Sequence, residues 1–245
     1  MRSADTRHHC NGIHRLLAVA VVMLVSLPAT HGQRASVTLR ATAGHNYTQS
    51  LYGAMAALGD YKYDSTLALS AGVELNTSAA TAATLGWQAG MRLGECRLLL
   101  VNRCLWRRFA AWKINEFSGH VGAGVEWSGW RCQLGLATRM ITPTGVDWLN
   151  ESTDWIVEPF NLMYELLYRF RLDSAGRWRA ELRAADFDDF VTDRAYQPLF
   201  SCQAAWCITD KTELSARALL HPTGMMSLSA NYYEAMFNLG VKMLW

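Results

Sequence analysis

The chain has 245 residues, of which 51% are hydrophobic and 18% charged, and its formal net charge is +2 at pH 7. This length suffices for one large domain, and a charge so close to zero gives no indication of a nucleic-acid partner. No apolar run after residue 30 approaches the ~20 residues that a transmembrane helix needs. If the chain spans a membrane, we expect it to do so with β-strands.

The N-terminal residues have the pattern of a secretory signal peptide. Positively charged residues precede a short apolar run from Leu16 to Leu27. Thr30 and Gly32 are the small residues expected just before a cleavage site, so we expect residues 1–32 to be removed, with cleavage after Ala29 as the alternative. What remains has as many basic as acidic side chains.

Residues 33–245 repeat one pattern, in which apolar and polar side chains alternate over segments of about ten residues. A period of two indicates β-strands with one apolar and one polar face, and its repetition along a whole chain is typical of a transmembrane β-barrel. We predict twelve strands, at Ala35–Thr42, Tyr47–Leu58, Ser65–Leu75, Thr84–Leu93, Arg97–Arg107, Phe117–Trp127, Trp130–Met140, Phe160–Leu172, Trp178–Phe187, Tyr196–Ile208, Lys211–Leu220 and Tyr232–Trp245. The second alternates poorly and is included mainly because such barrels have an even number of strands.

The connections between these segments alternate in length. One set is tight, such as Gly94-Glu95 and Ser128-Gly129, and the other is long, such as 108–116 and 141–159. Short periplasmic turns and longer outer loops are typical of bacterial outer-membrane barrels, which places both termini in the periplasm. A soluble β-sandwich would also alternate, but its outside would be uniformly polar. Large aromatic residues near the strand ends favour the barrel.

The last segment ends on Trp245, and every second residue before it is apolar. This ending resembles the C-terminal strand of bacterial outer-membrane barrels, which the barrel-assembly machinery recognises. The resemblance implies an assembly signal at Phe237, Leu239, Val241, Met243 and Trp245. It also implies outer-membrane lipids, the assembly machinery and periplasmic chaperones as partners, and the cell outer membrane as the location.

Several longer blocks resemble a family of uncharacterised outer-membrane barrels of Gram-negative bacteria. They are NRCLWRRF (102–109), INEFSGHVGAGVEW (114–127), EPFNLMYEL (158–166), YQPLF (196–200) and HPTGMMSLSANYYEAMFNLGVKMLW (221–245). The resemblance implies an all-β, antiparallel up-and-down transmembrane barrel of about twelve strands. The family has no assigned reaction, so no catalytic residue can be transferred, and we expect no cofactor and no metal.

The polar strand faces are rich in long charged side chains, which must pair or stay hydrated inside a low-dielectric wall. We expect arginine–glutamate networks in the lumen, with a surplus of arginine. The residues expected to line it are Arg92, Arg103, His120, Glu126, Arg131, Arg139, Glu165, Arg169, Glu181, Arg183, Glu213 and Arg217. Such a lumen predicts a narrow, anion-preferring channel or a binding barrel for small solutes. A structural or lipopolysaccharide-contacting barrel is the first alternative, and a lipid-modifying enzyme is the second.

Ser118 and His120 are the best catalytic candidates, because they share one strand face. A serine nucleophile needs a base and an orienting group within reach. No orienting group can be named, so we prefer a hydrogen-bonded lumen pair to an active site and expect no enzyme activity.

Two outer loops carry clustered charge. Arg107, Arg108 and Lys113 suit the phosphates of outer-leaflet lipids, although a solvated basic loop explains them equally well. An acidic run, Asp186, Asp188, Asp189 and Asp193, offers the oxygen ligands that divalent cations prefer. It lacks the spacing of a calcium loop, so we expect a solvated loop. The odd number of cysteines after residue 32 excludes a complete disulfide framework, and we expect free thiols.

Overall fold

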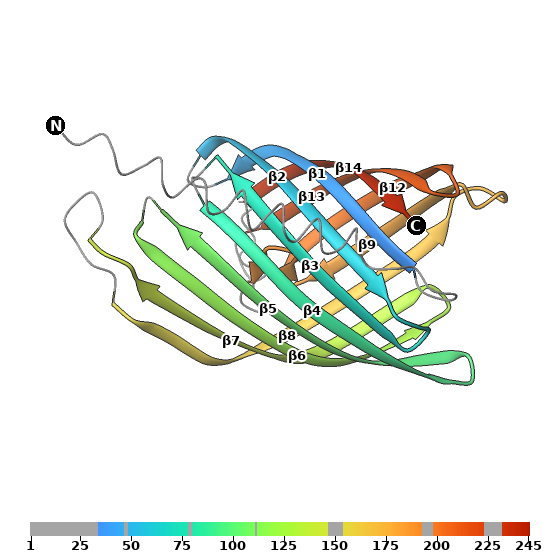
Figure 1. Cartoon of the computed structure of the whole chain (residues 1–245), viewed down its shortest axis with the longest axis horizontal. Helices are drawn as coiled ribbons and strands as arrows, with labels where there is room; N and C mark the ends of the chain where they lie inside the picture. Colours follow the sequence, from blue (N-terminus) through green and yellow to red (C-terminus); the bar gives the residue numbers. More distant parts are fainter. Residues whose placement is uncertain are drawn as a thin grey trace.

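The computed structural model describes residues 34–46, 49–77, 80–110, 112–146, 154–192, 198–222 and 232–245. In this part of the chain, twelve strands form one closed antiparallel barrel in the order β1-β14-β13-β12-β9-β8-β7-β6-β5-β4-β3-β2 (Figure 1). No helix among the described residues is long and apolar enough to cross a membrane. The expected signal peptide, residues 1–32, lies outside the described residues.

Each predicted strand has a counterpart in the barrel wall, including the Ala-rich second one. The wall strands are β1 (Arg34–Asn46), β2 (Gln49–Lys62), β3 (Leu67–Asn76), β4 (Ala80–Leu93), β5 (Cys96–Phe109), β6 (Ile114–Trp127), β7 (Trp130–Pro143), β8 (Ile156–Arg171), β9 (Trp178–Ala185), β12 (Leu199–Thr209), β13 (Thr212–Pro222) and β14 (Tyr232–Leu244). Two short strands, β10 (Phe187–Asp188) and β11 (Val191–Thr192), pair with each other and are not part of the barrel wall. The predicted fold class, an all-β up-and-down barrel of twelve strands, is confirmed.

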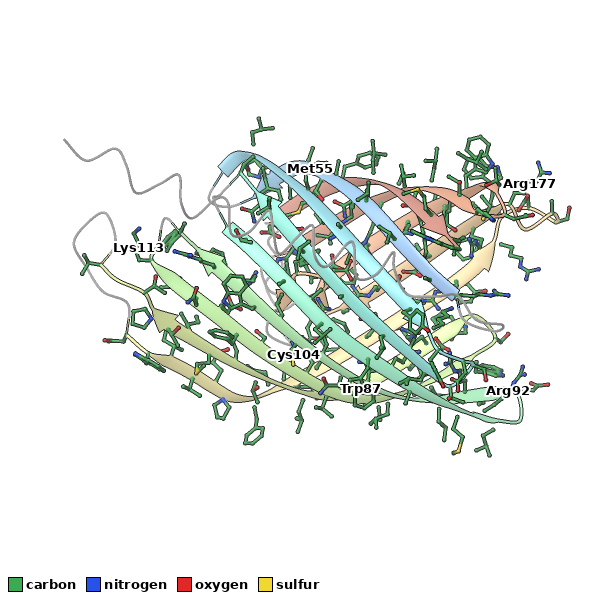
Figure 2. All side chains as sticks on the ribbon, in the orientation of Figure 1. Met55, Trp87, Arg92, Cys104, Lys113 and Arg177 are labelled. Carbon is green, nitrogen blue, oxygen red and sulfur yellow. The ribbon has the colours of Figure 1, made fainter. Side chains whose placement is uncertain are left out.

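The alternation places apolar side chains on the outside of the barrel. Leu85, Leu134 and Phe160 expose 65%, 64% and 74% of their surface, and Figure 2 shows Met55 and Trp87 pointing away from the strands. A soluble protein rarely exposes apolar side chains over a continuous surface. This exterior is therefore suited to lipid, as in transmembrane barrels.

Pairing between β1 and β14 closes the barrel. The two strands pair without interruption from Ser36 with Leu244 to Asn46 with Glu234. Gly44 is needed in this seam, because a Cβ atom there would lie 2.3 Å from the carbonyl oxygen of Ala235. The five residues of the expected assembly signal all face outwards, with 40–55% of their surfaces exposed. Their recognition by the assembly machinery stays a prediction.

The short turns have the local chemistry that tight connections require. Ser128 and Gly129, between β6 and β7, both have positive φ (47° and 88°), which is the geometry of a two-residue type I′ hairpin. Between β2 and β3, Asp64 accepts hydrogen bonds from the Thr66 hydroxyl and from the amides of Thr66 and Leu67. These bonds hold the pKa of the Asp64 carboxyl below its usual range.

Two wall strands carry a residue that departs from the strand pattern. Asn102 interrupts the apolar face of β5, yet its pairing with Trp87 and Val121 is regular. A register shift lies between β7 and β8, next to Thr138. Pro159 lies within β8 opposite this shift. A bulge tolerates proline because the ladder already lacks a hydrogen bond there.

We predict that replacing both Phe237 and Trp245 with asparagine abolishes assembly into the membrane. Both side chains lie on the outward face at the closing edge, 49% and 42% exposed, and two amides there would be left in hydrocarbon without partners. Heat-modifiable migration on gels and recovery from the outer-membrane fraction measure the outcome. Lys242→Gln, on the inward face of the same strand, is the control, and normal assembly of the double variant would contradict the prediction.

Candidate functional site

The barrel lumen is crossed by a segment of the chain that leaves the wall at the end of β9. We call Asp186–Val191 the inward segment. The ninth strand was expected to continue to Phe187, but β9 ends at Ala185. Asp186 ends the ladder, since its carboxylate accepts a hydrogen bond from the amide of Tyr164 at 2.9 Å. The segment that follows was expected to be a solvated outer loop, and this expectation is wrong.

Two phenylalanines anchor the inward segment to separate parts of the wall. Phe187 is 8% exposed and packs with Ala137, Met163 and Ala185, which belong to β7, β8 and β9. Phe190 is 3% exposed and packs with residues of β2, β4 and β5, namely Ala56, Leu58, Ala82 and Leu105. Because these anchors lie on different arcs of the barrel, the segment between them spans the lumen.

Arginines from four strands hold the acidic residues of this segment. Arg217 on β13 donates to both carboxylate oxygens of Asp188 at 3.0 Å, and Arg183 on β9 donates to the same group at 3.3 Å. Arg40 on β1 donates to Asp189 at 2.7 Å. On β5, Arg103 donates to the main-chain carbonyl of Asp188.

Three of these arginines also lie over the aromatic rings. The guanidinium of Arg183 lies 4.9 Å from the ring centroid of Phe187. The guanidinium of Arg103 lies 5.7 Å from the same centroid. Arg40 lies 5.6 Å from the centroid of Phe190. Cation–π contacts of this kind add to the ion pairs when water is excluded. The inward segment is thus fixed by charge and by ring contacts at once.

Further ion pairs line the lumen on both sides of the inward segment. Towards the outer loops, Glu116 is 2% exposed and accepts hydrogen bonds from Arg107 and Arg139. Towards the short turns, Glu126 accepts from Arg131 at 2.8 Å and from Arg97 at 3.3 Å. The expected arginine–glutamate networks between neighbouring strands are therefore confirmed.

All twelve residues predicted to line the lumen lie on the inward face. Eleven of them contact another lumen group: Arg103, His120, Glu126, Arg131, Arg139, Glu165, Arg169, Glu181, Arg183, Glu213 and Arg217. Arg92 forms no ion pair with any described residue. The functional role of these residues stays a prediction.

The sequence-based prediction missed several lumen residues. They are Arg40, Glu116, Glu158, Asp188 and Asp189. Glu116 and Glu158 were assigned to loops. The alternation continues to Glu116, whereas the register shift beside Thr138 disturbs it at Glu158. For the inward segment, the available signal was Phe187 and Phe190, two aromatic residues in an acidic run that a solvated loop would not need.

The missed carboxylates change the expected charge distribution. In the middle of the lumen, Arg40 and Arg217 face Asp189 and Asp188, so the arginine surplus expected along the whole lumen is offset there. Towards the short turns, Arg92 opposes Arg97 directly across β4 and β5. The excess of positive charge is concentrated at that end.

Other candidate residues do not assemble into a reactive site. The Ser118 hydroxyl is buried and has no hydrogen-bond partner among the described residues, and the His120 ring packs edge-on against Phe187 at 5.7 Å. A serine nucleophile would need the histidine as its base. In the described parts of the chain, no group of three or more His, Cys, Asp or Glu side chains could hold a metal, and the five cysteines there are free.

No family model and no curated protein matches the sequence. Solved structures are similar in fold. The KdgM porin in complex with disordered oligogalacturonate has a TM-score of 0.52 and 7% identity, over 85% of this chain and 98% of its own. The NanC porin has 0.51 and 7%, over 84% and 98%, and an outer-membrane channel from Pseudomonas putida F1 has 0.52 and 13%, over 90% and 97%.

We predict that Asp188→Asn loosens the inward segment. The Asp188 and Arg217 side chains are only 12% and 10% exposed, and removing one partner of a buried ion pair costs about 3–5 kcal/mol. Hydrogen exchange of the amides in 186–192 should become faster, while the wall strands keep their protection.

Asp189→Asn is the matched control, because its carboxylate is 41% exposed and partly exposed pairs contribute about 0–1 kcal/mol. Equal protection in the Asp188→Asn variant and the unmodified protein would show that the ring contacts alone hold the segment.

The three solved structures are 7–13% identical to this chain, so their likeness to it shows the fold alone. The chain has the fold of outer-membrane barrels of Gram-negative bacteria.

Proposed function

We propose that this chain is an integral outer-membrane barrel that provides a narrow pathway, or a binding barrel, for small anionic solutes. The observation that carries the proposal is the inward segment, which arginines hold across the lumen. A twelve-stranded barrel is wider than the eight-stranded barrels that side chains fill and narrower than open porins of 16–18 strands. A segment across such a lumen leaves room for small solutes only.

The preference for anions is supported by the excess of arginine towards the short turns. Arg92 and Arg171 face inwards there and form no ion pair with any described residue. A mouth lined by uncompensated positive charge concentrates anions and repels cations. The three similar structures are described as porins or as a channel, which agrees with a transport role.

A structural or lipopolysaccharide-contacting barrel is the alternative that a specific observation favours. Arg108 lies at the outer end of β5, opposite Asn115 and on the lipid-facing side, whereas its neighbour Arg107 faces inwards and binds Glu116. An outward arginine at that height could contact lipid phosphates. The lipid-modifying enzyme has no such support, and a lipid-esterase assay on purified protein tests it.

We predict small, anion-selective current steps from the purified protein in planar bilayers. Replacing Phe187–Val191 with a glycine–serine linker of equal length should raise the conductance several-fold, because both aromatic anchors and the acidic groups leave the lumen. A linker of the same kind in place of the exposed turn 173–176 is the control. Large cation-selective steps would contradict the proposal, and silence of all three proteins would favour the structural alternative.

A further inference from the structure

Two pairs of arginines oppose each other directly on the inward face near the short turns. Arg92 on β4 pairs in register with Arg97 on β5, and Arg171 on β8 pairs with Arg179 on β9. Like charges directly opposite each other in a ladder are destabilising. Arg97 and Arg179 are compensated by Glu126 and Glu213, but Arg92 and Arg171 have no carboxylate partner among the described residues.

The first of these pairs borders a polar cavity of about 500 Å³. The cavity lies between the β2–β3 turn and the hairpins that join β4 to β5 and β6 to β7. Its charged lining residues are three arginines and two glutamates, Arg92, Arg97, Arg169, Glu95 and Glu126, and neither glutamate forms an ion pair with Arg92. Its volume falls in the range of about 300–1,000 Å³ that small-molecule sites occupy, and Figure 2 shows Arg92 at the short-turn end of the barrel.

The wall holds Arg97 in place at this cavity. Its guanidinium donates to the carbonyl oxygen of Ser65 at 3.0 Å and to Glu126 at 3.3 Å. The group lies directly above Gly90, where a Cβ atom would come within 2.4 Å of Nε. Glycine at position 90 thus makes room for the guanidinium, and the two acceptors orient it.

Arg169 and Glu126 line the same cavity and form ion pairs with neighbouring strands. Arg169 donates to Glu181 at 2.8 Å and lies 3.7 Å from Glu126. Glu126 also binds Arg131, so one carboxylate is shared by three arginines. The guanidinium of Arg92 remains without an acceptor, beside an arginine that is already oriented.

We infer that Arg92 and Arg97 form a binding site for the oxyanion group of a small phosphorylated solute. A guanidinium presents paired N–H donors that match the oxygens of phosphate, and an anion between the two arginines removes their mutual repulsion. The inference rests on the proposed function in assigning this group to a solute of the pathway. Free phosphate offers the same chemistry, and the choice of probes separates the two sources.

Isothermal titration calorimetry of the purified full barrel in detergent tests the site. The probes are glucose 6-phosphate, inorganic phosphate and glucose. We expect both phosphates to bind and glucose not to bind. Arg92→Gln should weaken phosphate binding roughly tenfold, as expected for the loss of one charge-assisted contact. Tighter binding of glucose 6-phosphate than of inorganic phosphate identifies a solute site, and the reverse overturns that assignment in favour of free phosphate.

Arg177→Gln is the matched control, because Arg177 lies at the same end of the barrel (Figure 2) but does not line the cavity. Gly90→Leu is an independent variant that displaces the Arg97 guanidinium while keeping every charge, and it should weaken binding as well. Heat-modifiable migration verifies that each variant is folded. Equal phosphate affinity in the unmodified protein and in Arg92→Gln overturns the inference.

The binding measurement is independent of conduction. If bilayers stay silent while phosphate still binds in an Arg92-dependent way, the proposed pathway fails and the site stands. If anion-selective current is observed while no phosphate binds, the pathway stands and the site is overturned.

Discussion

The structure depends on one constraint, which is that no backbone N–H or C=O group can be left without a partner in hydrocarbon. Uninterrupted pairing of β1 with β14 satisfies it at the closing edge. Closure then assigns a face to every side chain, since a strand alternates between outside and inside. The exposed Leu85 and Phe160 and the buried Glu116 follow from this single requirement.

The interior raises a second problem, because closure directs many arginines into a confined space. Part of the solution lies in glutamates on neighbouring strands, such as Glu126 beside Arg131. The rest comes from the chain itself, since the inward segment supplies Asp188 and Asp189 as partners for Arg217 and Arg40. Breaking a buried ion pair is costly, so the segment that narrows the lumen is also one that the lumen charges hold in place.

The alternating pattern was enough to predict the strands, their order and the face on which Leu134 or Arg131 lies. It could not predict the inward segment, because alternation ends where the chain leaves the wall at Asp186. An acidic run without periodicity has the composition of a solvated loop, and its burial depends on arginines more than 80 residues away in the sequence, such as Arg103. Glu158 was missed for a different reason, since the register shift beside Thr138 disturbs the pattern there.

Along the barrel axis, paired and uncompensated charges lie in different regions of the lumen. At the inward segment, guanidinium and carboxylate groups are paired, so this region limits size while contributing little net field. At the short-turn end, Arg92 and Arg171 are uncompensated by described residues, so in the proposed pathway that mouth attracts anions. The two regions share strands β4, β5, β8 and β9, but Arg92 and Arg171 form no ion pair with the inward segment or with any other described residue. We therefore expect that replacing either arginine changes the choice of ion while the inward segment stays in place.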